Sequence, residues 1–235
     1  MENIYLFDVD GTLTPARQPM TEEFADFFKD WCKDKRVFLI SGSDYIKLEE
    51  QVSQSLLKSL DGVFGCMGNT CHFRGLRVYR SNFVVPSALR AYLDECLERS
   101  SFPLRTGNHM ERRTGMLNFS IIGRNATQDE RKTYHEYDCE HQERITIAKT
   151  INESYEGIEA AVGGEISIDI YPTGSDKSQI LAHIPKGHYV FFGDRMESGG
   201  NDYALAQKLQ ETESYALHPV NTYQDTWNII KENYL

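Results

Sequence analysis

Two carboxylates one residue apart, Asp8 and Asp10, are the side chains of this sequence best suited to carry chemistry. They follow the apolar segment Ile4–Phe7 and precede Gly11, so they stand where a buried strand is expected to end. Acids in that position are costly to bury unless something compensates them, and Mg²⁺ with several retained waters does so. One carboxylate can then ligate the metal and attack an electrophile while the other handles a proton. The alternative, a simple Asp-Gly turn, is disfavoured by the whole string Phe7–Thr14.

A second polar turn, Ser41-Gly42-Ser43-Asp44, follows the apolar segment Val37–Ile40. Its backbone N–H groups and small hydroxyl side chains, such as Ser43, can hold a phosphoryl group. A plain N-cap for the helix that begins near Tyr45 is the other interpretation, and the two are compatible.

The C-terminal part of the chain supplies the remaining candidates for this site. Asp194 ends the apolar segment Tyr189–Phe192 and can complete a Mg²⁺ shell, with Asn201 and Asp202 in support. Lys177 begins a short helix, where it can steady the negative charge of a phosphorylated aspartate.

Four arginines form a second group of candidates. Arg17 stands seven residues after Asp10, at the rim of the same predicted site. Arg113, Arg124 and Arg131 are placed at a strand start, a strand end and a helix start, so they can converge on one point. Guanidinium groups bind phosphate bidentately, which predicts a phosphate site. Separate, solvated surface arginines are the alternative.

A strand predicted over residues 165–171 offers a different kind of contact. Its period of two places three isoleucines on one face, and Ser167 and Asp169 on the other. A hydroxyl and a carboxylate side by side on an open strand face suit sugar hydroxyls, although a solvent face is the default for such a pattern.

The elements expected to position these residues alternate at both ends of the chain. Strands are predicted at 4–7, 37–40 and 189–192, and helices at 21–34, from 45, around 180, at 203–210 and at 223–233. This alternation predicts an α/β fold with a doubly wound parallel sheet.

The pattern changes between residues 83 and 174. A helix is predicted at 87–99, a strand with one buried face at 117–122, and a helix from about 128 that begins with the capping box Thr127–Glu130. We therefore expect a core domain of residues 1–82 and 175–235, with an α+β cap domain of residues 83–174 inserted into it and covering its active edge.

Composition narrows the classes of function. The 235 residues are 40% hydrophobic, enough for a sizeable core, and the net charge of −10 argues against a nucleic-acid surface. It does not exclude anionic substrates, because a local arginine cluster can outweigh the global sign. Five cysteines without C-x-x-C spacing predict free thiols in a reducing cytoplasm, and neither a signal peptide nor a membrane span is expected.

Four stretches together resemble a known family. They read FDVDGTLTPARQ (Phe7–Gln18), R-x-G-M-L-N-x-S-x-I-G-R (Arg113–Arg124), GG-x-I-S-x-D-x-x-P-x-G-x-DK (Gly163–Lys177) and FGDRMESGGND (Phe192–Asp202). The D-x-D-G-T string resembles the signature of the haloacid dehalogenase (HAD) superfamily of phosphoryl-transfer enzymes. All four stretches, in this order over both domains, resemble the eukaryotic-type phosphomannomutases.

The resemblance implies a set of roles. Asp8 would be the nucleophile that forms a phospho-aspartate and Asp10 the general acid/base, with Mg²⁺ held by Asp8, the Asp10 backbone carbonyl and Asp194. The substrate-binding positions would be Arg17, Arg113, Arg124, Arg131, Ser167 and Asp169, and the remaining phosphoryl contacts Ser43 and Lys177. It further implies interconversion of mannose 6-phosphate and mannose 1-phosphate, a hexose 1,6-bisphosphate activator, and a cytoplasmic homodimer formed through the cap.

The chain also departs from the family pattern. Gly65-Cys66-Met67-Gly68 lacks the usual Glu-Asn-Gly, Arg195–Ser198 replaces a Lys-Thr-x-Pro run, and Ile121 stands where a proline is usual. After Asp202 the F-x-D-x-x-T pattern of a second cation site is missing. Two other functions stay open: a Mg²⁺-dependent HAD sugar-phosphate phosphatase, in which water takes the phosphoryl group, and a non-catalytic binding module, which the intact strand-end motifs disfavour.

Overall fold

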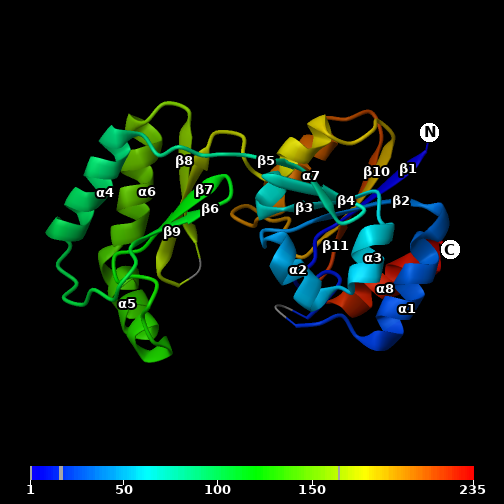
Figure 1. Cartoon of the computed structure of the whole chain (residues 1–235), viewed down its shortest axis with the longest axis horizontal. Coiled ribbons are helices and arrows are strands. Elements are labelled where there is room, and N and C mark those ends of the chain that lie inside the picture. The colour runs from blue at the N-terminus through cyan, green and yellow to red at the C-terminus, as the bar shows by residue number, and fades with distance from the viewer. Residues whose placement is uncertain (1, 16–17, 164) are drawn as a thin grey trace. The chain divides into compact units, whose positions relative to one another are not determined.

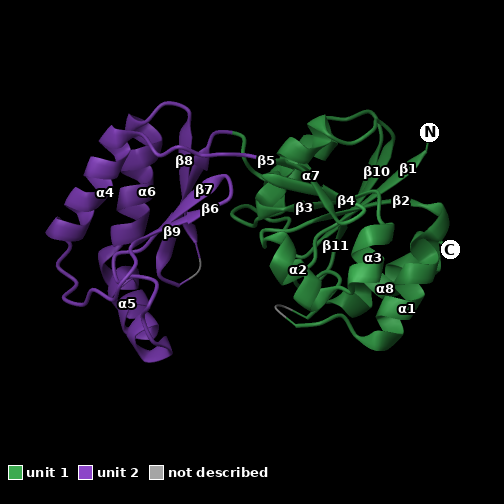
Figure 2. Cartoon of the chain, in the orientation of Figure 1, with its two compact units in different colours: residues 1–80, 174–235 green, residues 81–173 purple. Residues whose placement is uncertain are grey.

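Two compact units make up the protein, which a computed structural model describes over residues 2–15, 18–163 and 165–235 (Figure 2). Unit 1 contains residues 1–80 and 174–235, and unit 2 contains residues 81–173. Unit 1 is therefore discontinuous in sequence, and unit 2 is inserted into it.

Unit 1 is built on a seven-stranded sheet with the order β11-β10-β1-β2-β3-β4-β5 (Figure 1). Its strands are β1 (Asn3–Phe7), β2 (Arg36–Ile40), β3 (Gly62–Gly65), β4 (Thr70–Phe73), β5 (Leu76–Arg80), β10 (His188–Gly193) and β11 (Tyr215–Pro219). The first five strands in this order pair in parallel, whereas β4 and β5 form an antiparallel extension. Because parallel strands share one carboxyl edge, the polar residues that follow β1, β2 and β10 leave the sheet on the same side.

Helices cover both faces of this sheet, as a doubly wound fold requires. One face packs against α1 (Glu22–Trp31), α2 (Tyr45–Gln51), α3 (Gln54–Ser59) and α8 (Tyr223–Asn233). The other face packs against the 3₁₀ helix η3 (Lys177–Ala182) and α7 (Tyr203–Gln210). The two-residue period of β1 explains the division, because Phe7 enters the first core and Leu6 the second.

Unit 2 has a core of its own, between a four-stranded antiparallel sheet and three helices. The sheet order is β6-β7-β9-β8. The strands are β6 (Met110–Arg113), β7 (Met116–Phe119), β8 (Ile158–Gly163) and β9 (Ser167–Pro172), and the helices are α4 (Ser87–Arg99), α5 (Gln128–His141) and α6 (Glu143–Ser154). Apolar residues of the helices, such as Leu93 and Ile151, meet Phe119, Ile168 and Ile170 of the sheet.

Most of the predicted elements are confirmed. The helices at 203–210 and 223–233 have the predicted bounds, and the predicted capping box at Thr127–Glu130 begins α5. The sheet of unit 1 is mixed rather than wholly parallel, because β4 and β5 pair antiparallel. This hairpin was not predicted, and β3, α3, α6, β8 and β11 were also missed. All five cysteines are free, and within the described residues no helix is long and apolar enough to cross a membrane.

The prediction of a strand with one buried face at 117–122 is wrong. The strand β7 ends at Phe119, and the residues expected to face solvent, Asn118, Ser120 and Ile122, are all buried. The Ser120 hydroxyl can be buried because its hydrogen bonds are satisfied: it donates to the Ile166 carbonyl and accepts from the Gly123 N–H. Both sides of this segment are therefore packed.

A buried ion pair joins the end of α5 to the start of α6. Asp138 accepts hydrogen bonds from the Arg144 backbone N–H and from its Nε, each at 2.8 Å, and the two residues are only 8% and 4% exposed. Arg144 also approaches the Ser167 carbonyl, at the first residue of β9. The pair therefore ties two helices to the sheet of unit 2.

Asp138→Ala should lower the free energy of unfolding of unit 2 by about 3–5 kcal/mol, because it leaves a buried arginine without its charge partner. Urea denaturation followed by circular dichroism measures the loss. Glu136→Ala, at an exposed position of the same helix, is the matched control. Equal stabilities of the two variants would contradict the structural importance of the pair.

Candidate active site

The loop after β1 is shaped so that Asp8 is fixed at the edge of the sheet. The Val9 carbonyl accepts hydrogen bonds from the backbone N–H groups of Leu13 and Thr14, which closes a tight turn. Gly11 has a φ of +81°, and a Cβ built on it would stand 2.4 Å from Asp194 Oδ2. The glycine is therefore required both by the turn and by the close approach of the second acid.

Three carboxylates meet at this edge. The parallel register pairs Phe7 with Phe192. Asp8 and Asp194 therefore lie side by side just beyond the carboxyl ends of β1 and β10. Oxygens of Asp8, Asp194 and Asp202 lie within 4.8 Å of one another. Asp8 and Asp202 are almost fully buried and Asp194 is half-buried.

Lys177 supplies a positive charge to this cluster. Its side chain is completely buried, and Nζ donates hydrogen bonds to Asp8 Oδ1 and, at 2.6 Å, to Asp202 Oδ1. The second oxygen of Asp202 accepts from the Arg195 backbone N–H at 3.1 Å. Asp202 thus orients Lys177, and Lys177 orients Asp8.

One ammonium does not balance three carboxylates in a buried cluster. Burial raises the pKa of Asp8 to about 7, and Asp202 acts in the same direction while Lys177 opposes it. Burial, followed by the Asp202 charge, raises the pKa of Asp194 to about 6. For Lys177 burial acts downward, but the two carboxylates outweigh it and hold its pKa above the ordinary value. The cluster keeps an excess of negative charge that a cation would relieve.

The donor set fits a hard divalent cation. Carboxylate oxygens are the preferred ligands of Mg²⁺, and the cluster offers three carboxylates. The amide oxygen of Asn201, next to Asp202, is buried and accepts no hydrogen bond. A buried oxygen without a donor fits a position beside a cation or its bound water. Asp8, Asp194 and Asp202 therefore form a possible metal site.

Asp10 and Ser43 lie at the same edge of the sheet but outside this acidic cluster. The Asp10 carboxylate accepts a hydrogen bond from Gln51 Nε2 at 2.8 Å. Ser43 follows β2, and its backbone N–H donates to the Ser41 hydroxyl at 3.0 Å. The predicted metal contact through the Asp10 carbonyl stays a prediction. Arg17 lies outside the described residues.

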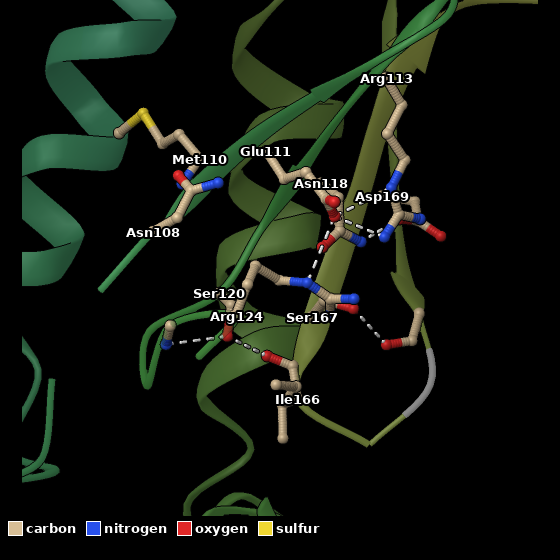
Figure 3. A network of polar contacts seen from close by, with 12 residues as sticks. Asn108, Met110, Glu111, Arg113, Asn118, Ser120, Arg124, Ile166, Ser167 and Asp169 are labelled. Atoms are coloured by element: carbon tan, nitrogen blue, oxygen red, sulfur yellow. Dashed lines mark hydrogen bonds and ion pairs between the residues drawn. The ribbon is translucent and has the colours of Figure 1, made fainter. Parts of the chain in front are cut away.

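Unit 2 carries a separate polar network around the predicted arginines (Figure 3). The strand register aligns Glu111 of β6 with Asn118 of β7, and Asn118 with Asp169 of β9. Glu111 accepts from Arg113 at 2.6 Å and forms an ion pair with Arg124 at 3.3 Å. Asn118 Nδ2 donates to Asp169 Oδ1 at 2.5 Å. A row of polar residues thus crosses three strands.

Arg124 is incompletely satisfied within this network. Its Nε is buried and, although within ion-pair range of Glu111, makes no hydrogen bond of good geometry. Burial lowers the pKa of Arg124, and the neighbouring charges of Arg113 and Arg131 lower it further. The charges of Arg113 and Arg131 therefore act on Arg124, and an anion placed near it would relieve the repulsion. The convergence of the three arginines on one phosphate stays a prediction.

The other predicted members of this group are placed differently. Arg131 donates from Nε to the Ala126 carbonyl at 3.1 Å and from Nη2 to the Arg124 carbonyl at 3.3 Å, so it braces the loop that carries Arg124. Ser167 does not lie on an open strand face, because it is 5% exposed and its hydroxyl donates to the Gly163 carbonyl. Asp169 is partly exposed, and its negative charge acts to raise the pKa of Arg124.

Sequence reasoning missed Glu111, Asn118 and Gln51. Glu111 and Asn118 stand within or beside the arginine motif, and a strand register would have aligned Glu111 with Asn118 and Asn118 with Asp169. Gln51 is 41 residues from Asp10, and no pattern in the sequence connects them.

The comparison with known proteins gives the family. The chain matches the family described as eukaryotic phosphomannomutase over residues 24–235, which is well over half of its length. The chain belongs to this family. The family consists of enzymes, the phosphomannomutases, which are phosphohexose mutases.

Relatives and solved structures agree with this membership. The chain is 33% identical to phosphomannomutase 1 of Dictyostelium discoideum, over 97% of this chain and 95% of that protein. It is 34% identical to the phosphomannomutase of Saccharomyces cerevisiae, over 98% and 94%. A haloacid dehalogenase-like hydrolase from Bacteroides thetaiotaomicron has the same fold, with a TM-score of 0.64 at 12% identity and 100% coverage of both chains. The trehalose-6-phosphate phosphatase of Aspergillus fumigatus matches with a TM-score of 0.59 at 15% identity, over 98% of this chain and 92% of that chain.

The raised pKa values predict a pH dependence of stability for the metal-free protein. Because the folded pKa values of Asp8 and Asp194 exceed the unfolded value near 3.8, the folded state holds protons that the unfolded chain has released. Stability contributed by these groups is therefore lost as the pH rises from about 4 to about 7. Asp194→Asn, which cannot ionise, should flatten this loss.

Urea unfolding in EDTA at several pH values between 5 and 8 measures the effect, as the difference between wild type and Asp194→Asn. Taking the difference cancels the titration of the histidines. Saturating Mg²⁺ should stabilise the wild type more at pH 8 than at pH 5, since protons compete for the same oxygens. An identical pH dependence of wild type and variant in EDTA would show that Asp194 does not carry the excess charge.

Proposed function

We propose that this protein interconverts mannose 6-phosphate and mannose 1-phosphate through a phospho-aspartate on Asp8 and a hexose bisphosphate. The observation that carries the proposal is that the protein has two groups suited to a phosphorylated ligand. One is the carboxylate cluster around Asp8, which suits a reacting phosphoryl group with its cation. The other is the arginine group of unit 2, which suits a phosphate that does not react. A simple phosphatase needs only the first.

The first transfer uses groups that lie at the edge of the unit 1 sheet. A carboxylate oxygen of Asp8 attacks phosphorus of the bisphosphate, the bond from phosphorus to the sugar oxygen breaks, and Asp10 gives a proton to that oxygen. In the reverse direction Asp10 takes the proton of a sugar hydroxyl while that oxygen attacks phospho-Asp8. If the bisphosphate turns between the two transfers, the product is the isomer.

Lys177 would stabilise the negative charge that develops during these transfers. Its ammonium is already hydrogen-bonded to Asp8 and held there by Asp202, so it needs no reorganisation when negative charge develops. A bound Mg²⁺, held by Asp8, the Asp10 carbonyl and Asp194, would neutralise phosphoryl oxygens. The Ser43 hydroxyl and the neighbouring N–H groups would donate hydrogen bonds to the phosphoryl oxygens.

Unit 2 would then act as a cap. Arg113, Arg124 and Arg131 would bind the distal phosphate and Asp169 a sugar hydroxyl, with Ser167 fixing the strand start from which Asp169 projects. Arg17 is proposed at the rim of the site. A hexose 1,6-bisphosphate activator would supply the first phosphoryl group. We also propose a cytoplasmic homodimer formed through unit 2, on the resemblance to the family alone.

Asp8→Asn should abolish both phosphoenzyme formation and isomerisation while leaving the fold intact, because the change removes the nucleophile but hardly alters the shape. The assay uses mannose 1-phosphate with hexose 1,6-bisphosphate and Mg²⁺, and scores mannose 6-phosphate against free phosphate. Asp26→Asn, at an exposed position of α1, is the matched control. Activity in Asp8→Asn would remove Asp8 from the mechanism, and free phosphate as the main wild-type product would favour the phosphatase.

Arg124→Ala should reduce kcat/KM for the sugar phosphates by roughly 10- to 150-fold, the loss expected for one hydrogen-bonded contact to a charged group. Hydrolysis of a small ester without a second phosphate should hardly change. Arg99→Ala, an exposed arginine of the same unit, controls for the loss of positive charge at fixed ionic strength. Equal losses on the sugar bisphosphate and on the small ester would mean that Arg124 does not bind the distal phosphate.

A further inference from the structure

The carboxylate proposed for proton transfer is held by a side chain far away in the sequence. Gln51 is the last residue of α2, and its side chain is 8% exposed. Its Nε2 donates to Asp10 Oδ1 at 2.8 Å and to the Thr14 hydroxyl at 3.3 Å. Both N–H groups of the amide therefore donate to the loop that follows β1.

The orientation of this amide follows from its two partners. The Thr14 hydroxyl donates to the Val9 carbonyl, so it meets Gln51 with a lone pair. An ionised carboxylate can only accept. Both neighbours therefore require the NH₂ end of the amide, and a flipped amide would place its oxygen against two acceptors.

Gln51 is itself held firmly. Its backbone carbonyl accepts a hydrogen bond from the Met20 N–H at 2.8 Å, and the next residue, Val52, closes the helix onto the Leu48 carbonyl. Leu48 and Val52 are part of the core beneath the sheet. The amide thus transmits the position of a packed helix to Asp10.

We propose that Gln51 is a positioning residue for proton transfer, which fixes the rotation of the Asp10 carboxyl group by holding Oδ1. This inference rests on the proposed function, because the position of the Asp10 carboxyl group affects the reaction only if Asp10 exchanges a proton with the sugar oxygen. The proton then passes through Oδ2: it leaves the sugar hydroxyl as the oxygen–phosphorus bond forms, and it returns when that bond breaks. Gln51 takes no proton at any point.

An amide suits this task better than a charged donor. It cannot titrate, so it offers the same two hydrogens throughout the reaction. It also adds no positive charge next to the carboxylate cluster, where Lys177 already stands. A donor within about 3 Å restricts the carboxyl rotation, and proton transfer depends steeply on such geometry.

The test separates proton transfer from phosphoryl transfer by changing the leaving group. A sugar oxygen needs a proton as it leaves, whereas p-nitrophenolate does not. Gln51→Met keeps the length of the side chain and removes both donors. We expect single-turnover transfer from a hexose 1,6-bisphosphate to Asp8 to slow by about 10- to 100-fold, which is a part of the ~10²–10⁴-fold that general acid–base catalysis contributes as a whole. The burst of p-nitrophenolate from p-nitrophenyl phosphate should change by less than about twofold, since this leaving group departs without a proton.

Gln51→Glu provides a second variant that keeps shape and polarity but replaces the donors by acceptors, and it should show the same selective loss. Gln54→Met, the same substitution at an exposed glutamine of α3, is the matched control and should leave both rates unchanged. A fall of both rates together in the Gln51 variants would mean a merely structural role and would overturn the inference. Unchanged rates with both substrates would overturn it as well.

Asp10→Asn, measured in parallel, distinguishes the two levels of the argument. If Asp10→Asn loses the sugar reaction and keeps the p-nitrophenolate burst, while Gln51→Met leaves both rates unchanged or lowers both together, the proposed function stands and the role of Gln51 is refuted. If Asp10→Asn lacks this signature, or the wild type does not act on sugar phosphates at all, the proposed function itself fails.

Discussion

The excess of buried negative charge at the carboxyl ends of β1 and β10 is the constraint on which the site in unit 1 depends. Three carboxylates meet there, and the only ammonium among the described residues that contacts them is that of Lys177. Burying such a group without a cation is unfavourable, so the surrounding structure has to hold it in place. The glycine at position 11, the parallel register of Phe7 with Phe192 and the full burial of Lys177 all serve that requirement.

Unit 2 contains the opposite imbalance, an excess of positive charge. Burial and the neighbouring charges of Arg113 and Arg131 lower the pKa of Arg124, and Glu111 opposes only part of this effect. Each unit is therefore organised around one kind of unbalanced charge: negative in unit 1 and positive in unit 2. A phosphorylated ligand with a divalent cation would carry both complements, and this is the physical support for the proposed function.

The sequence predicts those parts of this arrangement that depend on local rules. The acids after β1 and β10 were identified because an apolar run ends at each of them, and the capping box of α5 because its residues are three apart. The β4–β5 hairpin was missed because Arg77 and Arg80 interrupt the apolar pattern of an edge strand. The burial of Asn118 and Ser167 was missed because a period of two says which residues share a face, not whether another element covers that face. The role of Gln51 could not be predicted, because its contact with Asp10 arises only from the tertiary packing of two segments that are far apart in the sequence.

The departure at the turn after β3 has a structural explanation. Cys66 and Met67 both have positive φ, 51° and 60°, where glycine or asparagine is easier to accommodate, and each non-glycine residue there costs roughly 1–2 kcal/mol. The turn nevertheless donates its backbone N–H groups to the Ser43 and Ser41 carbonyls, each at 2.9 Å, and Gln179 binds the Met67 carbonyl. These contacts come from the backbone, so they do not require the Glu-Asn-Gly sequence usual in the family. The chain can therefore lose the familiar residues of this turn and still hold the Ser41–Ser43 loop in place at the edge of the sheet where Asp8 lies.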